Sequence, residues 1–267
     1  MSLSIAFSPC PNDTFVFHAL VHGLVEGAPE LDVTYADVDV TNTAAEKGRF
    51  DLVKVSYAAL PWLLDRYELL PCGGALGYGC GPLVLTNGGT VDGGRVAVPG
   101  ERTTAYLLFR LWAGKHQPAR IDVVPFHEIM PGVADGRYDA GLVIHEARFT
   151  YQRYGLTALA DLGQWWQDET GLPIPLGAIL AKRDTVEAAQ AAGWVRDSVR
   201  QAWAAPARSQ GYVLEHAQEL EPDVVAQHIA LYVNEFTENL GDEGYAAVRT
   251  LLNRAASAGL LPRRSSL

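Results

Sequence analysis

The sequence predicts a two-lobed α/β protein in which each lobe is a mostly parallel sheet flanked by helices and the two lobes enclose a ligand cleft. Short runs rich in Val, Ile and Leu alternate with helical patterns, which is typical of βαβ units. A local repeat indicates that the lobes are similar. Gly48-Arg49-Phe50-Asp51 opens a buried run that ends at Ser56, and Gly136-Arg137-Tyr138-Asp139 opens one that ends at His145.

Residues 1–90 are expected to form most of the first lobe. A strand over Leu3–Phe7 is followed by the turn Ser8-Pro9-Cys10-Pro11 and a helix over about Asn12–Val25. Later apolar and helical patterns predict strands over Leu31–Val38, Phe50–Val55 and Gly81–Thr86, and a helix over Tyr57–Arg66.

After the glycine-rich segment Gly88–Gly94 the pattern starts again, so residues 91–177 are expected to form the second lobe. Strands are predicted over Arg95–Val98, Ile121–Pro125 and Tyr138–Ile144, and helices over Thr103–Ala113 and Glu128–Asp135. A further strand is predicted over Ile174–Ala181, and its part from about Leu176 is expected to return the chain to the first lobe. We expect a loop around Trp165 and Trp166. Residues 178–267 are expected to return to the first lobe as helices, with disorder only over Arg263–Leu267.

The composition argues against several classes of protein. A content of 48% hydrophobic and 19% charged residues is that of a folded globular chain. The net charge of −10 argues against nucleic-acid and anionic-membrane partners, which need a basic face, although one pocket can still bind an anion. No stretch approaches the ~18 apolar residues of a membrane span, and no signal-peptide pattern opens the chain. We expect a cytoplasmic protein, and the sequence carries no signal of its oligomeric state.

Polar residues gather where predicted strands end, and ligands bind outside the carboxyl ends of parallel strands. At three of these turns a helix follows, and its first N–H groups suit a carboxylate or phosphate. The simpler interpretation is that Asn12, Ser56 and Thr103 only cap helices. Convergence of several turns on one face favours a small anionic ligand. The four turns are Ser8–Thr14, Lys54–Ser56, Arg102–Ala105 and His145–Arg148.

Two residues in these turns are expected to carry chemistry. Lys54 lies in a buried-looking strand, where its ammonium group is expected either to pair with a carboxylate of the fold or to emerge into the cleft. His145 ends an apolar strand and is the candidate general base, since a histidine facing a cleft can accept a proton near neutral pH. A purely structural histidine is the alternative.

Other chemical patterns are weaker. His18 and His22 have a spacing that suits a metal, but no third ligand follows them, so we predict no metal. The GxSxG, P-loop and GxGxxG motifs are absent. Cys10 is expected to be a buried thiol rather than a nucleophile. Trp165 and Trp166 are expected either to stack on an aromatic ligand or to pack between the lobes, and the sequence leaves this open.

Several segments, in order and at matching spacing from residue 5 to about residue 240, resemble one family of enzymes. The chain resembles the 1,4-dihydroxy-6-naphthoate synthases, which belong to the futalosine route of menaquinone biosynthesis. The segments are Ser8–Phe15, Lys54–Ala59, Gly73–Gly77, Val98–Gly100 with Thr103–Tyr106, Ile144–Tyr151 and Gly171–Gly177.

The resemblance implies a fold like that of the type 2 periplasmic binding proteins. It also implies a carbon–carbon lyase that cleaves cyclic dehypoxanthinylfutalosine to 1,4-dihydroxy-6-naphthoate and a sugar-derived fragment, without a metal or organic cofactor. The resemblance implies that His145 is the general base. The implied substrate contacts are Lys54, Val55, Ser56, Thr103, Thr104 and Ala105, with Asn42 as a weaker candidate.

Three alternatives share the expected fold. A binding protein of a transport system is expected to carry a signal peptide or a lipoprotein cysteine, and neither pattern is present. A transcription regulator is expected to carry a helix-turn-helix domain before the fold. Chorismate dehydratase, an enzyme of the same pathway, is disfavoured by the Ser8–Phe15 and His145 segments.

Overall fold

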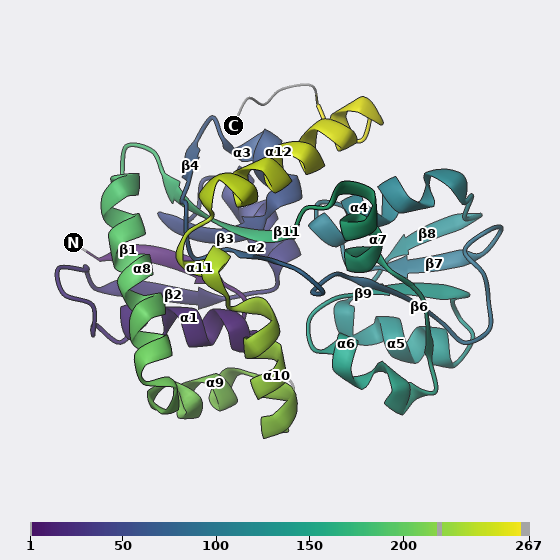
Figure 1. Ribbon diagram of the computed structural model, residues 1–267, viewed down its shortest axis with the longest axis horizontal. Coiled ribbons are helices and arrows are strands. Elements are labelled where there is room, and N and C mark those ends of the chain that lie inside the picture. The colour runs from purple at the N-terminus through teal and green to yellow at the C-terminus, as the bar shows by residue number, and fades with distance from the viewer. Residues whose placement is uncertain (1, 218–220, 263–267) are drawn as a thin grey trace.

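The computed structural model describes residues 2–217 and 221–262 and shows two α/β bodies side by side (Figure 1). Each body is built on one sheet, and the chain crosses from the first sheet to the second and back. The expectation of disorder over Arg263–Leu267 concerns residues outside the described part of the chain.

The first sheet has six strands in the order β2-β1-β3-β11-β4, with β5 also paired to β11. The strands β1 and β3 run parallel, as do β1 and β2, whereas β11 runs antiparallel to β3, β4 and β5. Their bounds are β1 Leu3–Phe7, β2 Leu31–Tyr35, β3 Leu52–Ser56, β4 Tyr67–Leu69, β5 Ala75–Gly77 and β11 Ile174–Lys182.

The second sheet has five strands in the order β10-β6-β9-β7-β8. The central strand β9 runs parallel to β7 and antiparallel to β6, and β6 pairs antiparallel with β10 at the edge. Their bounds are β6 Leu83–Thr86, β7 Arg95–Val98, β8 Arg120–Val123, β9 Ala140–Val143 and β10 Thr157–Asp161.

The two-lobed α/β fold is confirmed, but the sheets are mixed rather than mostly parallel. The reason lies in the two strands that carry the crossings. Gly177 near the start of β11 pairs with Ser56 at the end of β3, and Leu83 at the start of β6 pairs with Val143 at the end of β9. Each crossing strand therefore enters its sheet at the edge where its neighbour ends, which makes the pair antiparallel. Because β6 belongs to the second sheet and β11 to the first, the chain crosses before residue 83 and returns before residue 174, earlier than the expected crossings near 90 and 178.

Helices flank both sheets, and the C-terminal helices α8 to α12 lie with the first sheet (Figure 1). The longer ones are α1 Pro11–Val21, α2 Val38–Glu46, α4 Thr104–Trp112, α5 Phe126–Ala134, α7 Leu162–Thr170, α8 Ala188–Ala204, α10 Pro222–Tyr232 and α12 Gly241–Ser257. The shorter ones are α3 Leu60–Leu63, α6 Ala147–Thr150, α9 Gln210–His216 and α11 Glu235–Glu238, with 3₁₀ turns over Tyr57–Ala59, Ala113–Lys115, Tyr151–Tyr154 and Pro206–Arg208.

The expected loop around Trp165 and Trp166 is wrong, since both residues lie in α7. Asp161 caps this helix by accepting hydrogen bonds from the N–H groups of the next turn, and Gly171 ends it in the left-handed conformation. Trp166 is fully buried and donates a hydrogen bond to the carbonyl oxygen of Pro173 at 3.1 Å. It belongs to a core cluster that runs through both bodies, so it packs the fold rather than a ligand.

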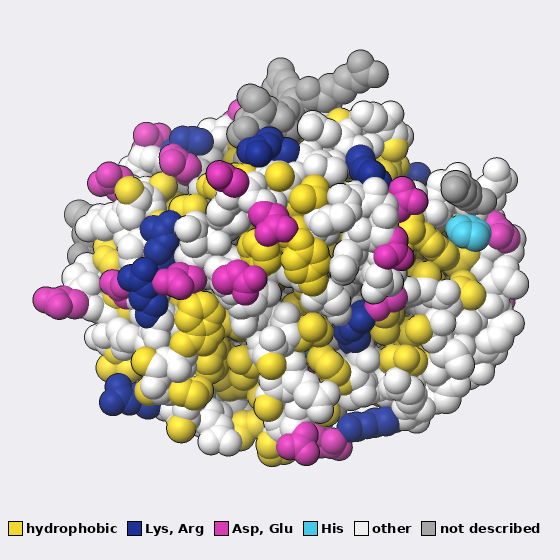
Figure 2. All heavy atoms as spheres, viewed as in Figure 1, with side chains coloured by type: hydrophobic (Ala, Val, Ile, Leu, Met, Phe, Trp, Pro, Cys, Tyr) yellow, Lys and Arg dark blue, Asp and Glu magenta, His cyan; other side chains and the backbone are white. Residues whose placement is uncertain are grey.

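Charged side chains are interspersed with apolar ones over the face seen in Figure 2, where acidic groups lie beside many of the Lys and Arg side chains. Among the described residues, no helix has the length and apolar character needed to cross a membrane.

Candidate active site

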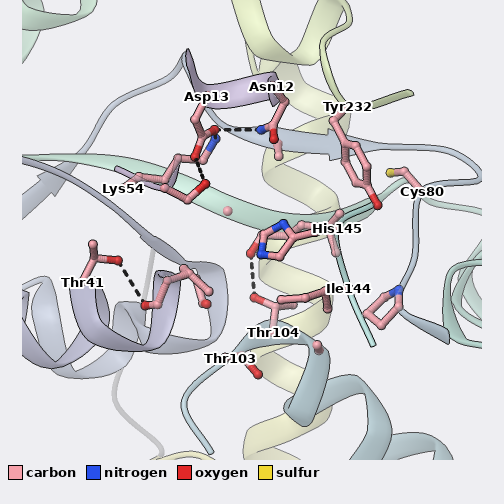
Figure 3. A pocket seen from close by; sticks show the side chains of 18 of the residues that line it. Asn12, Asp13, Thr41, Lys54, Cys80, Thr103, Thr104, Ile144, His145 and Tyr232 are labelled. Carbon is pink, nitrogen blue, oxygen red and sulfur yellow. Dashed lines mark hydrogen bonds and ion pairs between the residues drawn. The ribbon is translucent and has the colours of Figure 1, made fainter. Parts of the chain in front are cut away.

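The four polar turns meet at one cavity between the two sheets, as the sequence predicts. This cavity has an empty volume of about 690 Å³, mouth included, which lies within the range of small-molecule sites. Its wall also includes residues from β11 and α10. Its chemically important lining residues are Asn12, Asp13, Lys54, Ser56, Thr103, Thr104, His145, Leu176, His228 and Tyr232 (Figure 3).

A buried ion pair forms the wall on the side of the first sheet. Lys54 is only 6% exposed, and its ammonium group pairs with the carboxylate of Asp13 (Figure 3). That carboxylate also accepts hydrogen bonds from the Ser8 hydroxyl at 2.8 Å and from the Asn12 amide at 2.7 Å. The lysine therefore has its counter-ion inside the fold, which was one of the two expectations for it, and it still lines the cavity.

Asn42 lies behind this wall rather than on it. Its amide group donates hydrogen bonds to the Ser56 hydroxyl and to the carbonyl oxygen of Arg102, both at 3.2 Å, and its carbonyl oxygen accepts from the Ser56 N–H at 2.8 Å. Asn42 thus links α2, the end of β3 and the turn before α4. Ser56 faces the cavity, and its side chain makes no capping bond to the following turn.

The start of α4 forms the facing wall. Thr103 caps this helix by accepting a hydrogen bond from the N–H of Tyr106 at 3.1 Å, so the simpler capping interpretation holds for this residue. Thr104 donates its hydroxyl hydrogen to the carbonyl oxygen of Leu176 at 2.8 Å and accepts from the N–H of Ala58 at 3.2 Å. Thr104 therefore ties the second body to the first at the edge of the cavity.

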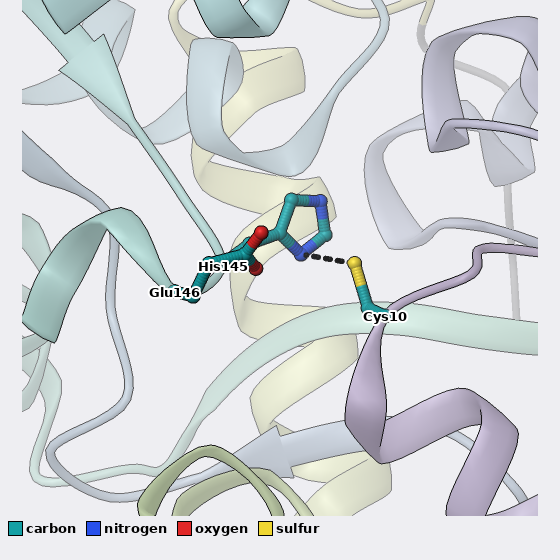
Figure 4. Close-up of side chains that lie close together, drawn as sticks. All are labelled: Cys10, His145 and Glu146. Atoms are coloured by element: carbon teal, nitrogen blue, oxygen red, sulfur yellow. Dashed lines mark hydrogen bonds between the residues drawn. The ribbon is translucent and has the colours of Figure 1, made fainter. Parts of the chain in front are cut away.

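His145 follows β9 and extends into the middle of the cavity (Figure 3). Its φ of 55° is in the left-handed region, which is uncommon for a residue other than glycine and is typical of functional positions. The imidazole packs edge-on against the ring of Phe126, and its Nδ1 lies 3.3 Å from the sulfur of Cys10 (Figure 4). Among the described residues Nε2 has no hydrogen-bond partner, so this nitrogen is available to a ligand.

Cys10 and Glu146 complete a small cluster around this imidazole (Figure 4). Burial, with a contribution from the carboxylate of Glu146, raises the pKa of the Cys10 thiol well above its usual range, so the thiol stays protonated at neutral pH. Glu146 is itself buried, and its Oε2 has no hydrogen-bond partner in the described part of the chain. The cluster places a buried carboxylate beside the ring that would become charged on taking up a proton.

The same cluster is where side chains could hold a metal ion. The ligand atoms of Cys10, His145 and Glu146 all lie within 4.8 Å of one another. His18 and His22, the pair considered from the sequence, lie elsewhere. Nδ1 of His22 is hydrogen-bonded to the carbonyl oxygen of His18, and the two rings pack against each other. Sulfur, imidazole and carboxylate ligands suit Zn²⁺, but the cluster supplies an accessible base equally well without it.

His228 and Tyr232 on α10 complete the cavity, and sequence reasoning missed both. His228 is fully buried, packs against Tyr232 and stacks over His145 with 6.5 Å between the ring centroids. No local motif marks α10, because these residues reach the cavity only through the packing of a C-terminal helix on the first sheet.

The structure therefore brings together most of the residues expected to contact a ligand. Lys54, Ser56, Thr103, Thr104, Ala105 and His145 line the cavity, whereas Val55 and Asn42 do not. Val55 is a core residue of β3, and Asn42 is fully engaged behind Ser56. Contact of any of these residues with a substrate stays a prediction.

Two mixed sheets whose facing edges enclose a cavity with polar and apolar side chains in its wall define a protein of the periplasmic-binding-protein-like class. An alkanesulfonate-binding protein from Xanthomonas axonopodis pv. citri, solved with bound MOPS, has this fold with a TM-score of 0.74 at 16% identity, and the match covers 98% of this chain and 94% of that one. At this identity the likeness concerns the fold alone.

Within that class, the family model described as menaquinone biosynthesis matches residues 3–257, and the chain belongs to this family. A 1,4-dihydroxy-6-naphthoate synthase from Streptomyces coelicolor is 63% identical over 98% of this chain and 95% of the relative. One from Thermus thermophilus is 49% identical over 97% and 96%. A solved protein from Archaeoglobus fulgidus is 32% identical with a TM-score of 0.91, covering 97% of this chain and 98% of that one.

Proposed function

We propose that this protein is a 1,4-dihydroxy-6-naphthoate synthase that cleaves a carbon–carbon bond of cyclic dehypoxanthinylfutalosine. The observation that carries the proposal is the 63% identity, over nearly the whole chain, to a relative of that name. The cavity supports it, because an accessible histidine lies between walls that carry polar side chains, in a space of suitable size. The cytoplasmic location expected from the sequence remains a prediction.

The polar walls suit an anionic substrate in a specific way. Because the charge of Lys54 is already balanced by Asp13, the ligand carboxylate is best held by neutral donors. The N–H groups of Thr104 and Ala105 in the first turn of α4 lack partners within their helix and carry partial positive charge, whereas that of Tyr106 is bonded to Thr103. Ser56 adds a hydroxyl from the facing wall. A carboxylate bound there bridges the two bodies and favours their closure over the substrate.

His145 acts as the general base in this proposal. For Nε2 to accept a proton, Nδ1 must hold the hydrogen of the neutral ring, and the sulfur of Cys10 is the acceptor that lies 3.3 Å from it. When the ring becomes an imidazolium, the nearby carboxylate of Glu146 stabilises its charge. Cys10 and Glu146 thus position the base and support its charged form.

The rest of the cavity protects the intermediate. Removal of a proton by His145 precedes cleavage of the carbon–carbon bond, and formation of the aromatic naphthalene ring supplies the driving force. Apolar side chains such as Ile144 and Leu176 line the same space, and they exclude water from a carbanion-like intermediate.

The test is a turnover assay with cyclic dehypoxanthinylfutalosine and no added metal, with the naphthoate product followed by chromatography and mass detection. Wild type should form product, and a folded His145→Ala variant should form almost none. His22→Ala is the matched control, because this histidine is exposed at the end of α1 and outside the cavity, and it should keep full turnover. Tight substrate binding by a folded wild type that forms no product would instead identify a binding protein.

A further inference from the structure

His228 is a buried histidine of the cavity that the proposed base mechanism does not use. It lies at 0% exposure on α10, among the rings of His145, Phe149 and Tyr232. It lines the same cavity as His145. Its two ring nitrogens have different surroundings, and the difference determines what the ring can do.

A chain of hydrogen bonds sets which nitrogen carries the hydrogen. The Asp13 carboxylate, paired with Lys54, can only accept hydrogen bonds, so Asn12 must present its NH₂ group to it, at 2.7 Å. The carbonyl oxygen of the Asn12 amide is then turned to His228, 2.9 Å from Nε2. Since that oxygen also only accepts, Nε2 must carry the hydrogen and donate it.

The other nitrogen of His228 is therefore a bare acceptor. Burial, together with the nearby His145 and Lys54, lowers the pKa of His228 to about 3, so the ring is neutral and has one hydrogen to place. Nδ1 is buried and has no hydrogen-bond partner among the described residues. Unsatisfied buried acceptors are rare in folded proteins, and one on a residue that lines a ligand cavity calls for a ligand donor.

We propose that Nδ1 of His228 accepts a hydrogen bond from a hydroxyl group of the substrate and makes the cavity select ligands that carry one. This inference rests on the proposed function and assigns to His228 a recognition role within it. A carboxylate or sulfonate oxygen at this position would set lone pair against lone pair, so the site separates a hydroxyl end of the ligand from its anionic end. His228 is a specificity-determining residue, whereas His145 accepts the proton.

Two substitutions test the roles of the two ring nitrogens of His228 separately. In His228→Gln the side-chain NH₂ can occupy the place of Nε2 and keep the bond to Asn12, but nothing replaces Nδ1. In His228→Asn the side-chain oxygen can occupy the place of Nδ1, while the bond to Asn12 is lost. If Nδ1 binds a substrate hydroxyl, the glutamine variant should lose about tenfold or more in kcat/KM, the effect of one hydrogen bond, and the asparagine variant should lose less.

Substrate affinity is measured beside turnover, by calorimetry in the His145→Ala background. Weaker binding by His228→Gln than by His228→Asn supports the hydroxyl contact, and equal affinity of His228→Gln and its parent overturns it. Binding without turnover in the wild type would overturn the proposed function alone, and absence of both would overturn both proposals. The ligand-free wild type gives a test that needs no variant: ¹⁵N NMR should show the hydrogen of His228 on Nε2, and a hydrogen on Nδ1 would refute the inference.

Discussion

Replacement of His145 by glycine and by alanine separates its chemical role from its backbone conformation. Both variants remove the imidazole that we propose as the general base, and loss of a general base lowers turnover by about 10²- to 10⁴-fold. The two variants differ in one respect. The φ of 55° at this position is strained for alanine and relaxed for glycine.

The stability difference follows from that angle. Left-handed backbone costs a residue with a Cβ about 1–2 kcal/mol, while glycine costs roughly 0.5–1 kcal/mol more in conformational entropy on folding. His145→Gly should therefore be more stable than His145→Ala by about 1 kcal/mol, measured by denaturant unfolding. Both variants lose the same contact with Phe126, so this contact cancels in the comparison.

Turnover is measured on the same two preparations, with and without added imidazole. The glycine variant should be nearly inactive, and imidazole should restore part of its rate because the space of the missing ring is open to the cavity. Near-normal turnover in either folded variant would refute the role of the base. A glycine variant no more stable than the alanine variant would refute the argument from the backbone.

Four further predictions concern the surroundings of the base. Cys10→Ala should turn over about fivefold more slowly than Cys10→Ser, because serine keeps an acceptor for Nδ1 of His145, and equal rates would exclude a positioning role for the thiol. Lys54→Met should lower the free energy of unfolding, measured with denaturant, by about 3–5 kcal/mol, because it leaves the buried Asp13 carboxylate without its counter-ion. The double variant with Asp13→Asn should regain part of the lost stability, and a single variant as stable as wild type would contradict the argument. The unfolded chain protonates His228 near its ordinary pKa of about 6.5, whereas the folded protein does so only near 3. The free energy of unfolding should therefore decrease as the pH is lowered from 6.5 toward 3, by up to about 1.4 kcal/mol per pH unit from this residue, and His228→Gln should flatten the curve. Dialysis against EDTA should leave turnover unchanged, and a rate that falls and then returns with added metal would show that the cluster around Cys10 holds an ion in the active protein.

The sequence was sufficient for the features that depend on neighbours along the chain. Alternating apolar runs and helical patterns predicted both bodies, and the polar turns after β1, β3, β7 and β9 predicted a site at the strand ends. The local pattern was sufficient to predict this site, because the residues that follow a buried strand lie at the edge of its sheet. His145 could be singled out for that reason.

Expectations based on local pattern were less reliable where the helix signals are brief. The segment around Trp165 and Trp166 forms a short helix, and the signals that mark it are the cap at Asp161 and the stop at Gly171. The antiparallel direction of β6 and β11 also has no local signature, because it depends on which edge of the sheet the chain enters after crossing between the bodies.

Tertiary packing alone decided the chemistry of the cavity wall. Whether Lys54 would pair with a carboxylate or face a ligand depended on Asp13, which lies on a separate element, 41 positions earlier in the chain. His228 comes 216 positions after Asn12, and only the packing of α10 against α1 joins them. A hydrogen bond between such distant residues leaves no spacing to recognise in the sequence, since it is made by the packing of helices and strands and not by the chain between them.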